Sequence, residues 1–363
     1  MQRRDALKRL AVALPLGTLW VMNARQSIAV AEAPLGSLAN IYSADRTIEI
    51  EIDPETQEAA VAACVAVSPN GQVVVAGADD HRIRVWNIAD GSLVTQLREH
   101  TDWVRAVAFH PAGKLLASAS DDYSVVVWNL DGGTVLHRFD VDGGVLHNVA
   151  FRPDGKLLAS SGFDDVVRLF DVEAGKLVKE LKCPASDVRA LAFAPNNRRL
   201  AAAGRDGVVR IWDLTDFSVV ADVPAHRMRI RSIAYSTDGA TFATAGDDRK
   251  LFLWNADGAR AAALPAPSGL VFSLKFVGPD RLAMGTSDNL IRVLDVQSRR
   301  ELSQLSGHTG SVAALDCHAD TGLMASAAFD TTVRLWKPQG SDRPAATVTQ
   351  LPTLAPPKQI LTK

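Results

Sequence analysis

Short apolar runs, separated by turn-forming residues, fill the chain from about residue 60 to residue 340. One well-defined stretch contains four such runs, at residues 104–109, 115–118, 124–128 and 135–139. Their length and their content of Val, Leu and aromatic residues are typical of β-strands rather than helices. The apolar and polar pattern therefore predicts an all-β protein built from many short strands.

The segments between these runs have the chemistry of tight turns. Pro111 and Gly113 lie between the first two runs, and Asp131 and Gly132 lie between the last two. Proline fixes one backbone angle and glycine accepts a left-handed one, which together favour reversal of the chain. An Asp-Gly pair is also a strong hairpin signal. Successive strands are therefore expected to pair as an antiparallel sheet.

This four-strand pattern occurs seven times. The third strand of each copy ends in a large apolar residue, 40 or 42 positions from the next: Trp86, Trp128, Phe170, Trp212, Trp254, Leu294 and Trp336. An aspartate lies six positions before each of them, at Asp80, Asp122, Asp164, Asp206, Asp248, Asp288 and Asp330. A period of about 40–45 residues that ends in tryptophan indicates a propeller blade. We expect a single domain over residues 61–340, a seven-bladed β-propeller of four-stranded antiparallel blades.

Residues 32–60 form a lead-in that contains a strand without a counterpart in the repeats. Residues 47–52 alternate apolar and charged side chains, which is the period of a half-buried strand. An open ring would leave sheet edges bare, so one end of the chain is expected to complete the blade at the other end. We favour residues 47–52 as the outer strand of the last blade. Residues 346–350, which would complete that blade locally, are the alternative, and residues 341–363 form a proline-rich tail.

Residues 1–31 have the composition of an export signal. Arg3 and Arg4 begin it, an apolar run follows from residue 10 to residue 22, and small residues at 29–31 suit a cleavage site. The arginine pair resembles a bacterial twin-arginine signal, although Ala6 stands where such signals usually carry a large apolar residue. An ordinary secretion signal and an uncleaved amphipathic anchor are the alternatives. We expect export to the periplasm, with no stable membrane span after cleavage.

Charge and cysteine content add two expectations. After residue 31 the chain carries six more acidic than basic residues, so it has no overall electrostatic reason to bind nucleic acid. Cys64, Cys183 and Cys317 form no CxxC pattern. Cys64 and Cys317 would lie about 10 Å apart on neighbouring blades, which is too far for a disulfide. All three are therefore expected to be free, buried thiols.

The repeats resemble the WD-repeat β-propeller family over residues 58–340. In that family a histidine, a hydroxyl residue, the turn aspartate and the tryptophan of one blade form a hydrogen-bonded tetrad. The resemblance implies complete tetrads in three blades: His100, Ser118, Asp122 and Trp128; His226, Thr244, Asp248 and Trp254; and His308, Ser326, Asp330 and Trp336. The sixth blade lacks both the histidine and the hydroxyl, so replacing Asp288 is expected to destabilise the chain less than replacing Asp122.

The tetrad residues are also the residue types of a hydrolase triad. Catalysis needs an exposed nucleophile beside an oxyanion site, whereas the tetrad arrangement places the hydroxyl inside a blade. The turn aspartates lack the dense oxygen spacing of a calcium loop. The sequence contains no HExxH motif, glycine-rich phosphate loop or GxSxG motif. We therefore expect no enzyme activity, no cofactor and no metal.

The resemblance also implies a binding face. In WD-repeat proteins, partners usually dock where the loops before the inner strands and the aspartate turns emerge. Alignment of the repeats places six candidate partner-binding residues there: Trp103, Phe163, Arg205, Arg227, Arg229 and Phe329. Aromatic residues and arginine dominate interface energies when exposed at such positions. The alternative is that Trp103 packs on its own loop and that the arginines pair with Asp187 and Asp247.

The expected function is that of a non-enzymatic, exported scaffold, monomeric by itself, that binds a protein or peptide on this face. The alternative is a propeller enzyme, or a cofactor- or ligand-binding protein, that uses the central channel. Fold alone does not separate the two, because one fold supports many functions.

The export route has a direct test. Replacing Arg3→Lys together with Arg4→Lys should abolish export by the twin-arginine pathway, because that pathway reads the arginines themselves, whereas an ordinary signal needs only positive charge. Immunoblots of periplasmic and cytoplasmic fractions compare the two versions. An unchanged periplasmic yield of the double variant would rule out the twin-arginine route.

Overall fold

The computed structural model describes residues 41–51 and 59–339. The predicted export signal, the proline-rich tail and the alternative closing strand at 346–350 lie outside the described residues. Residue 52, the last of the predicted closing strand, also lies outside them.

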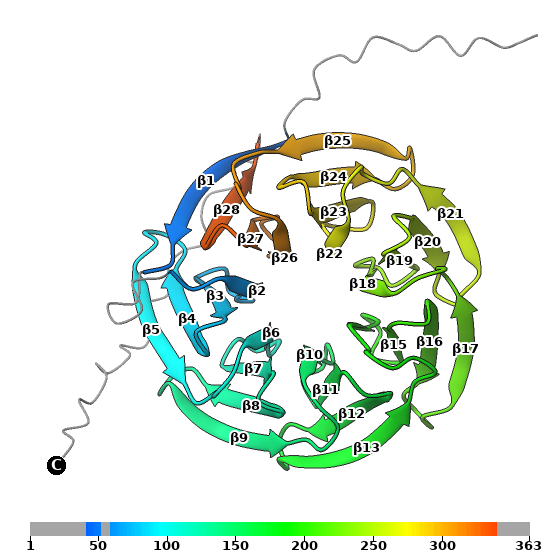
Figure 1. Ribbon diagram of the computed structural model, residues 1–363, viewed down its shortest axis with the longest axis horizontal. Helices are drawn as coiled ribbons and strands as arrows, with labels where there is room; N and C mark the ends of the chain where they lie inside the picture. The colour runs from blue at the N-terminus through cyan, green and yellow to red at the C-terminus, as the bar shows by residue number, and fades with distance from the viewer. Residues whose placement is uncertain (1–40, 52–58, 340–363) are drawn as a thin grey trace, which may run out of the picture. The chain divides into compact units, whose positions relative to one another are not determined.

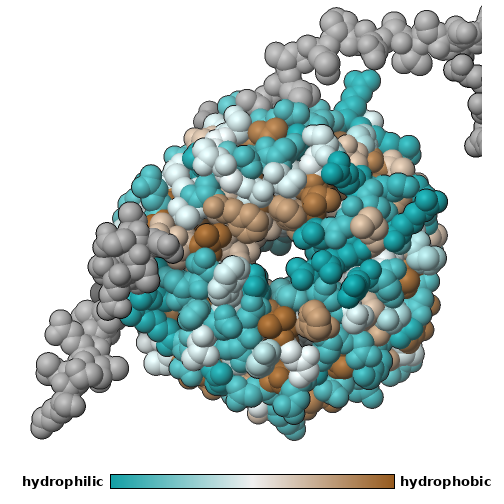
Figure 2. Space-filling model, viewed as in Figure 1, coloured by the Kyte–Doolittle hydropathy of each residue, from teal (hydrophilic) through white to brown (hydrophobic). Residues whose placement is uncertain are grey.

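Seven four-stranded antiparallel sheets form a ring around a central channel (Figures 1 and 2). This arrangement confirms the predicted all-β, seven-bladed propeller. In the first six blades the strands follow one another in sequence from the channel to the rim (Figure 1).

The strands are short and similar in length from blade to blade. The first three blades are β2 (Ala62–Val67), β3 (Val73–Ala78), β4 (Arg82–Asn87) and β5 (Leu93–Arg98); β6 (Val104–Phe109), β7 (Leu115–Ser120), β8 (Ser124–Asn129) and β9 (Thr134–Asp140); and β10 (Leu146–Phe151), β11 (Leu157–Gly162), β12 (Val166–Asp171) and β13 (Lys176–Lys182). The next three are β14 (Ala190–Phe193), β15 (Arg199–Ala203), β16 (Val208–Asp213) and β17 (Val219–Pro224); β18 (Ile230–Tyr235), β19 (Thr241–Gly246), β20 (Leu251–Asn255) and β21 (Arg260–Leu264); and β22 (Val271–Phe276), β23 (Arg281–Thr286), β24 (Ile291–Asp295) and β25 (Arg300–Leu305). The seventh consists of β26 (Val312–Cys317), β27 (Met324–Ala328), β28 (Thr332–Pro338) and, outermost, β1 (Tyr42–Glu49).

The N-terminal strand thus occupies the outer position of the seventh blade. β1 pairs antiparallel with β28, and Ile48 lies opposite Val333 in this pairing. Ile48 is buried, and the Tyr42 hydroxyl donates a hydrogen bond to the Gly322 carbonyl oxygen, 3.1 Å away. The strand begins at Tyr42, five residues before the expected position. Segments from opposite ends of the described chain are therefore held in one sheet.

Apolar side chains fill the spaces between neighbouring blades. Trp128 belongs to the same buried cluster as Ile83 and Val85 of the preceding blade. The second strands supply small buried residues such as Ala117, which allow adjacent sheets to approach closely. Neighbouring blades cover both faces of the inner three strands, so the sequences of these strands are nearly continuous apolar runs. The outer strands are the exposed ones.

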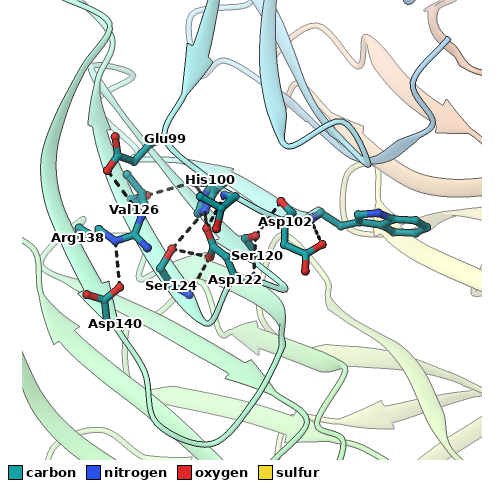
Figure 3. A network of polar contacts seen from close by, with 12 residues as sticks. Glu99, His100, Asp102, Ser120, Asp122, Ser124, Val126, Arg138 and Asp140 are labelled. Atoms are coloured by element: carbon teal, nitrogen blue, oxygen red, sulfur yellow. Dashed lines mark hydrogen bonds and ion pairs between the residues drawn. The ribbon is translucent and has the colours of Figure 1, made fainter. Parts of the chain in front are cut away.

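Figure 3 shows the polar network that joins the strands and turns of the second blade. His100 Nδ1 lies 2.8 Å from Asp122 Oδ2, and His100 Nε2 lies 2.7 Å from Ser118 Oγ. Trp128 Nε1 donates to the same hydroxyl oxygen over 2.8 Å. Burial alone would raise the pKa of Asp122, but hydrogen bonds from His100 and Ser124 hold that pKa well below its usual range.

The fifth and seventh blades contain the same network, in His226, Thr244, Asp248 and Trp254, and in His308, Ser326, Asp330 and Trp336. The histidine-to-aspartate distances are 2.8 and 2.9 Å, and both hydroxyls accept the indole N–H over 2.9 Å. The structure therefore brings together the residues of all three tetrads, and each tetrad hydroxyl is fully buried.

Three of the other blades use arginine where the histidine is missing. Arg84, Arg168 and Arg292 each lie four residues after the turn aspartate of their blade, and all three are buried. Their guanidinium nitrogens lie 2.6, 2.7 and 2.7 Å from the aspartate oxygens. The sequence carried this signal as an Asp-x-x-x-Arg pattern, which the tetrad motif does not include.

Asp288 has other polar partners in place of the missing histidine and hydroxyl, so we no longer expect its replacement to cost less than that of Asp122. Arg292 donates to both of its carboxylate oxygens, and the Thr286 hydroxyl also donates to it. The Arg292 hydrogen bond is the main cause that lowers the pKa of Asp288 to about 2. In the fourth blade Asp206 accepts a hydrogen bond from a backbone amide, while Arg210 turns to Asp222 instead.

Asp288→Ala should lower the free energy of unfolding by about 1–3 kcal/mol, as Asp122→Ala should, because each change leaves a buried donor without its acceptor. Asp206→Ala is the matched control and should cost less than about 1 kcal/mol, since its turn is exposed. Urea unfolding followed by tryptophan fluorescence measures all three variants. A loss for Asp288→Ala no larger than that for Asp206→Ala would contradict the role of the arginine.

Candidate interaction face and channel mouth

Backbone hydrogen bonds join the two loops that each blade presents on one face of the ring, called here the loop face. The residue before the turn aspartate donates its N–H over 2.8–3.2 Å to the residue before the inner strand: Asp79 to Val61, Asp121 to Trp103, Phe163 to Val145, Asp247 to Arg229, Ser287 to Leu270 and Phe329 to Ser311. The fourth blade differs by one residue, because Arg205 donates to Ser186. Each blade therefore holds two side-chain positions next to each other on this face.

The three predicted aromatic residues lie on the loop face and are well exposed. Trp103 is 40% exposed, Phe163 57% and Phe329 53%. The Arg105 guanidinium lies 4.3 Å from the centre of the Trp103 ring, which is a cation–π contact. Trp103 therefore packs against a residue of the adjoining strand and still presents much of its surface to solvent.

The predicted arginines divide into one that is paired and two that are not. Arg229 Nη2 lies 2.8 Å from Asp187 Oδ2, as the alternative interpretation expected. Arg205 and Arg227 form no ion pair within residues 41–51 and 59–339, although the Arg227 backbone amide donates to Asp248. Two guanidinium groups on this face are thus available to a partner.

Seven side chains that the sequence prediction missed line the mouth of the central channel. They lie two residues beyond the position that precedes each inner strand: Ala63, Arg105, His147, Arg189, Arg231, Phe272 and Ala313. The cavity that they line has a volume of about 580 Å³. The sequence could have indicated these residues, because they lie at the same offset in every repeat. Side chains two residues apart on a strand lie on the same face.

One side of this mouth is basic, and a buried carboxylate contacts three of its side chains. Asp187 Oδ1 lies 2.9 Å from Arg189 Nε and 3.1 Å from His147 Nε2, and Asp187 Oδ2 contacts Arg229. Asp187 has a left-handed backbone with φ of 54°, and a Cβ on Gly204 would lie 2.5 Å from its carbonyl oxygen. Burial lowers the pKa of His147, which favours the neutral imidazole. Side chains from three blades therefore contact one another through a single aspartate.

Two further arginines extend the basic side. Arg105 donates to Asp121 through both Nε and Nη2. Arg231 donates through Nε to Asp247, the corresponding residue of the fifth blade. The second to fifth blades thus contribute four arginines and one imidazole around three carboxylates.

The opposite side of the mouth is apolar. The ring centres of Phe272 and Phe329 lie 6.3 Å apart, and Ala63 and Ala313 complete this side. Arg231 lies over Phe272, 5.0 Å from the ring centre, at the junction of the two sides. In Figure 2, hydrophobic residues border the channel above β22, β26 and β2, and strongly hydrophilic residues border it on the side of β18.

The tetrad hydroxyls and two of the three cysteine thiols are buried in the described chain. The tetrad hydroxyls have no exposed surface, so a substrate does not reach them. Cys64 and Cys183 are free and buried, Cys317 is free and partly exposed, and burial raises the pKa of each thiol to about 12. Residues 41–51 and 59–339 contain no cluster of three or more metal-ligating side chains. Among these same residues, no helix has the length and apolarity that a membrane span requires.

Comparison with known protein families identifies the repeats. The WD domain, G-beta repeat, matches residues 56–87, 91–129, 133–171, 175–213, 217–255 and 299–337. Together these segments make up more than half of the chain. The chain belongs to the WD-repeat family. The first three strands of the sixth blade, β22 to β24, lie outside these matches, and this blade has Leu294 in place of tryptophan.

Two curated relatives match short stretches of this WD-repeat chain. The probable serine/threonine-protein kinase PkwA of Thermomonospora curvata is 47% identical over 45 residues, which cover 12% of this chain and 6% of that protein. Periodic tryptophan protein 2 of Arabidopsis thaliana is 41% identical over 44 residues, which cover 12% of this chain and 5% of that protein. The matched region thus spans a small fraction of either relative, about the length of one repeat.

Asp187→Asn should lower the free energy of unfolding by about 2–3 kcal/mol, because the basic groups around residue 187 lose their shared buried charge. The control is Asp154→Asn, which removes a more exposed carboxylate paired with Arg152 at the opposite end of a blade. That change should cost less than about 1 kcal/mol. Calorimetry gives both values, and equal losses would show that Asp187 does not hold the mouth together.

Proposed function

We propose that this WD-repeat chain is an exported, non-enzymatic scaffold that binds a protein or peptide partner on the loop face of the propeller. WD-repeat propellers typically mediate protein interactions, and this chain has the family fold. The observation that carries the proposal is the presence of three well-exposed aromatic side chains on one face: Trp103, Phe163 and Phe329.

The chemistry of these side chains suits a protein interface. Large aromatic side chains bury much apolar area when a partner covers them, and arginine supplies directed hydrogen bonds at the same surface. Arg205 and Arg227 lie on the fourth and fifth blades without an ion pair in the described chain. They are able to orient a partner against its carboxylate or carbonyl groups.

The non-enzymatic part of the proposal rests on burial. Each tetrad combines histidine, hydroxyl and aspartate, but its hydroxyl lies inside a blade and already accepts the tryptophan N–H. An acyl-transfer nucleophile must instead meet its substrate beside an oxyanion site. The recurrence of the tetrad in three blades is also what a structural role requires.

Export is proposed from the sequence of the first 31 residues. Their basic start, apolar run and small-residue site favour translocation, with the twin-arginine route as the specific proposal. The partner would then meet the propeller outside the cytoplasm, as a protein or peptide of the periplasm.

Trp103→Ala should weaken partner binding by about 2 kcal/mol, roughly a thirtyfold loss of affinity, and leave the fold intact. Proteins crosslinked to the wild-type chain in a periplasmic extract identify the partner, and titration calorimetry then compares the variants. Leu136→Ala on the rim strand β9 is the control, since Leu136 is 46% exposed but lies away from the loop face. A lower melting temperature with unchanged affinity would make Trp103 a packing residue.

A further inference from the structure

We propose that the channel mouth binds an acidic segment of the partner, in which carboxylate side chains stand beside an apolar one. This inference rests on the proposed function and adds the chemistry of the bound segment. It comes from the division of the mouth into a basic side and an apolar side.

The basic side concentrates positive charge on a chain that is acidic overall. Arg105, Arg189, Arg229 and Arg231 share three carboxylates with a neutral imidazole, whereas the whole chain has a formal net charge of −2. A concave site bordered by protein focuses such a local excess and attracts the opposite charge. Four arginines and three carboxylates leave the mouth with one net positive charge, which favours an anionic group.

The arginines of the mouth retain donors for such a group. A guanidinium has five N–H donors, and the hydrogen bonds from Arg189 and Arg231 to aspartate within the described chain use Nε. Their side chains remain partly exposed, at 35% and 24%. A carboxylate of the partner would add charge-assisted hydrogen bonds without displacing Asp187 or Asp247.

The apolar side restricts which anion fits. Phe272, Phe329, Ala63 and Ala313 would remain hydrated beside a small inorganic anion, but an apolar side chain next to the carboxylate would cover them. Arg231 packed over Phe272 places a cationic and an apolar contact within 5.0 Å of each other. Adjacent acidic and apolar residues of an extended peptide match this spacing.

Peptide selection tests the inference while the partner itself is still unidentified. A random peptide library displayed on phage is panned against the full chain, and the recovered peptides are synthesised with a fluorescent label. We expect enrichment of Asp or Glu beside an aromatic or aliphatic residue. Replacing the acidic residues by their amides should weaken binding to the wild-type chain at least about tenfold in fluorescence polarisation.

Protein variants locate the binding at the mouth. The double variant Arg189→Gln and Arg231→Gln should bind the acidic peptides at least about tenfold more weakly. Arg152→Gln is the control, because Arg152 pairs with Asp154 in a turn at the opposite end of a blade, and it should leave binding unchanged. If the double variant fails to fold, the comparison of acid and amide peptides on the wild-type chain decides the question.

The inference and the proposed function fail in different ways. Recovered peptides without acidic enrichment, peptides insensitive to the double variant, or recovery of no peptide at all would each overturn the acidic-segment inference. If partner binding still depends on Trp103 in any of those cases, the proposed function remains supported. Acidic peptides that bind the mouth while partner capture ignores Trp103 would support the inference and relocate the partner's main contact.

Discussion

Closure of the ring is the constraint on which the rest of the structure depends. Each blade covers its apolar faces with its two neighbours, so an open ring would expose the faces of the terminal blades as well as their strand edges. The pairing of β1 with β28 places both ends of the described chain in one blade, and that blade packs against the first. Closure also fixes where the seven inner strands meet, and therefore where the channel and its mouth form.

Either of two kinds of side chain, histidine or arginine, binds the turn aspartate of a blade. In three blades a buried histidine bridges the aspartate and a hydroxyl, and in three others a buried arginine binds the aspartate directly. In both cases a carboxylate satisfies a donor that burial would otherwise leave without a partner. The blade therefore tolerates loss of the histidine when another strand supplies the donor.

The functional chemistry of the loop face follows from positions that packing leaves free. The seven side chains that line the channel mouth lie outside the apolar clusters between the blades, so the apolar core does not select their identity. These positions carry basic residues in the second to fifth blades, and alanine or phenylalanine in the other three. The mouth is therefore divided into a basic side and an apolar side. Phe329 lines the same opening and Trp103 contacts Arg105 beside it, so these exposed aromatics extend the surface that a partner can cover.

The repeat alone determined the fold, because the 42-residue spacing, the turn residues and the seven aspartates are local features that the same blade geometry imposes each time. The resemblance to WD-repeat proteins added which residues form the tetrads and which aromatics are exposed, because aligned repeats carry those positions over. The partners of Asp288, the junction of three blades at Asp187 and the aromatic pair of Phe272 with Phe329 needed the tertiary structure. Each joins side chains whose meeting depends on rotamers and on the approach of separate loops or blades. Sequence spacing places such residues on a face, but only packing decides which charges and rings come into contact.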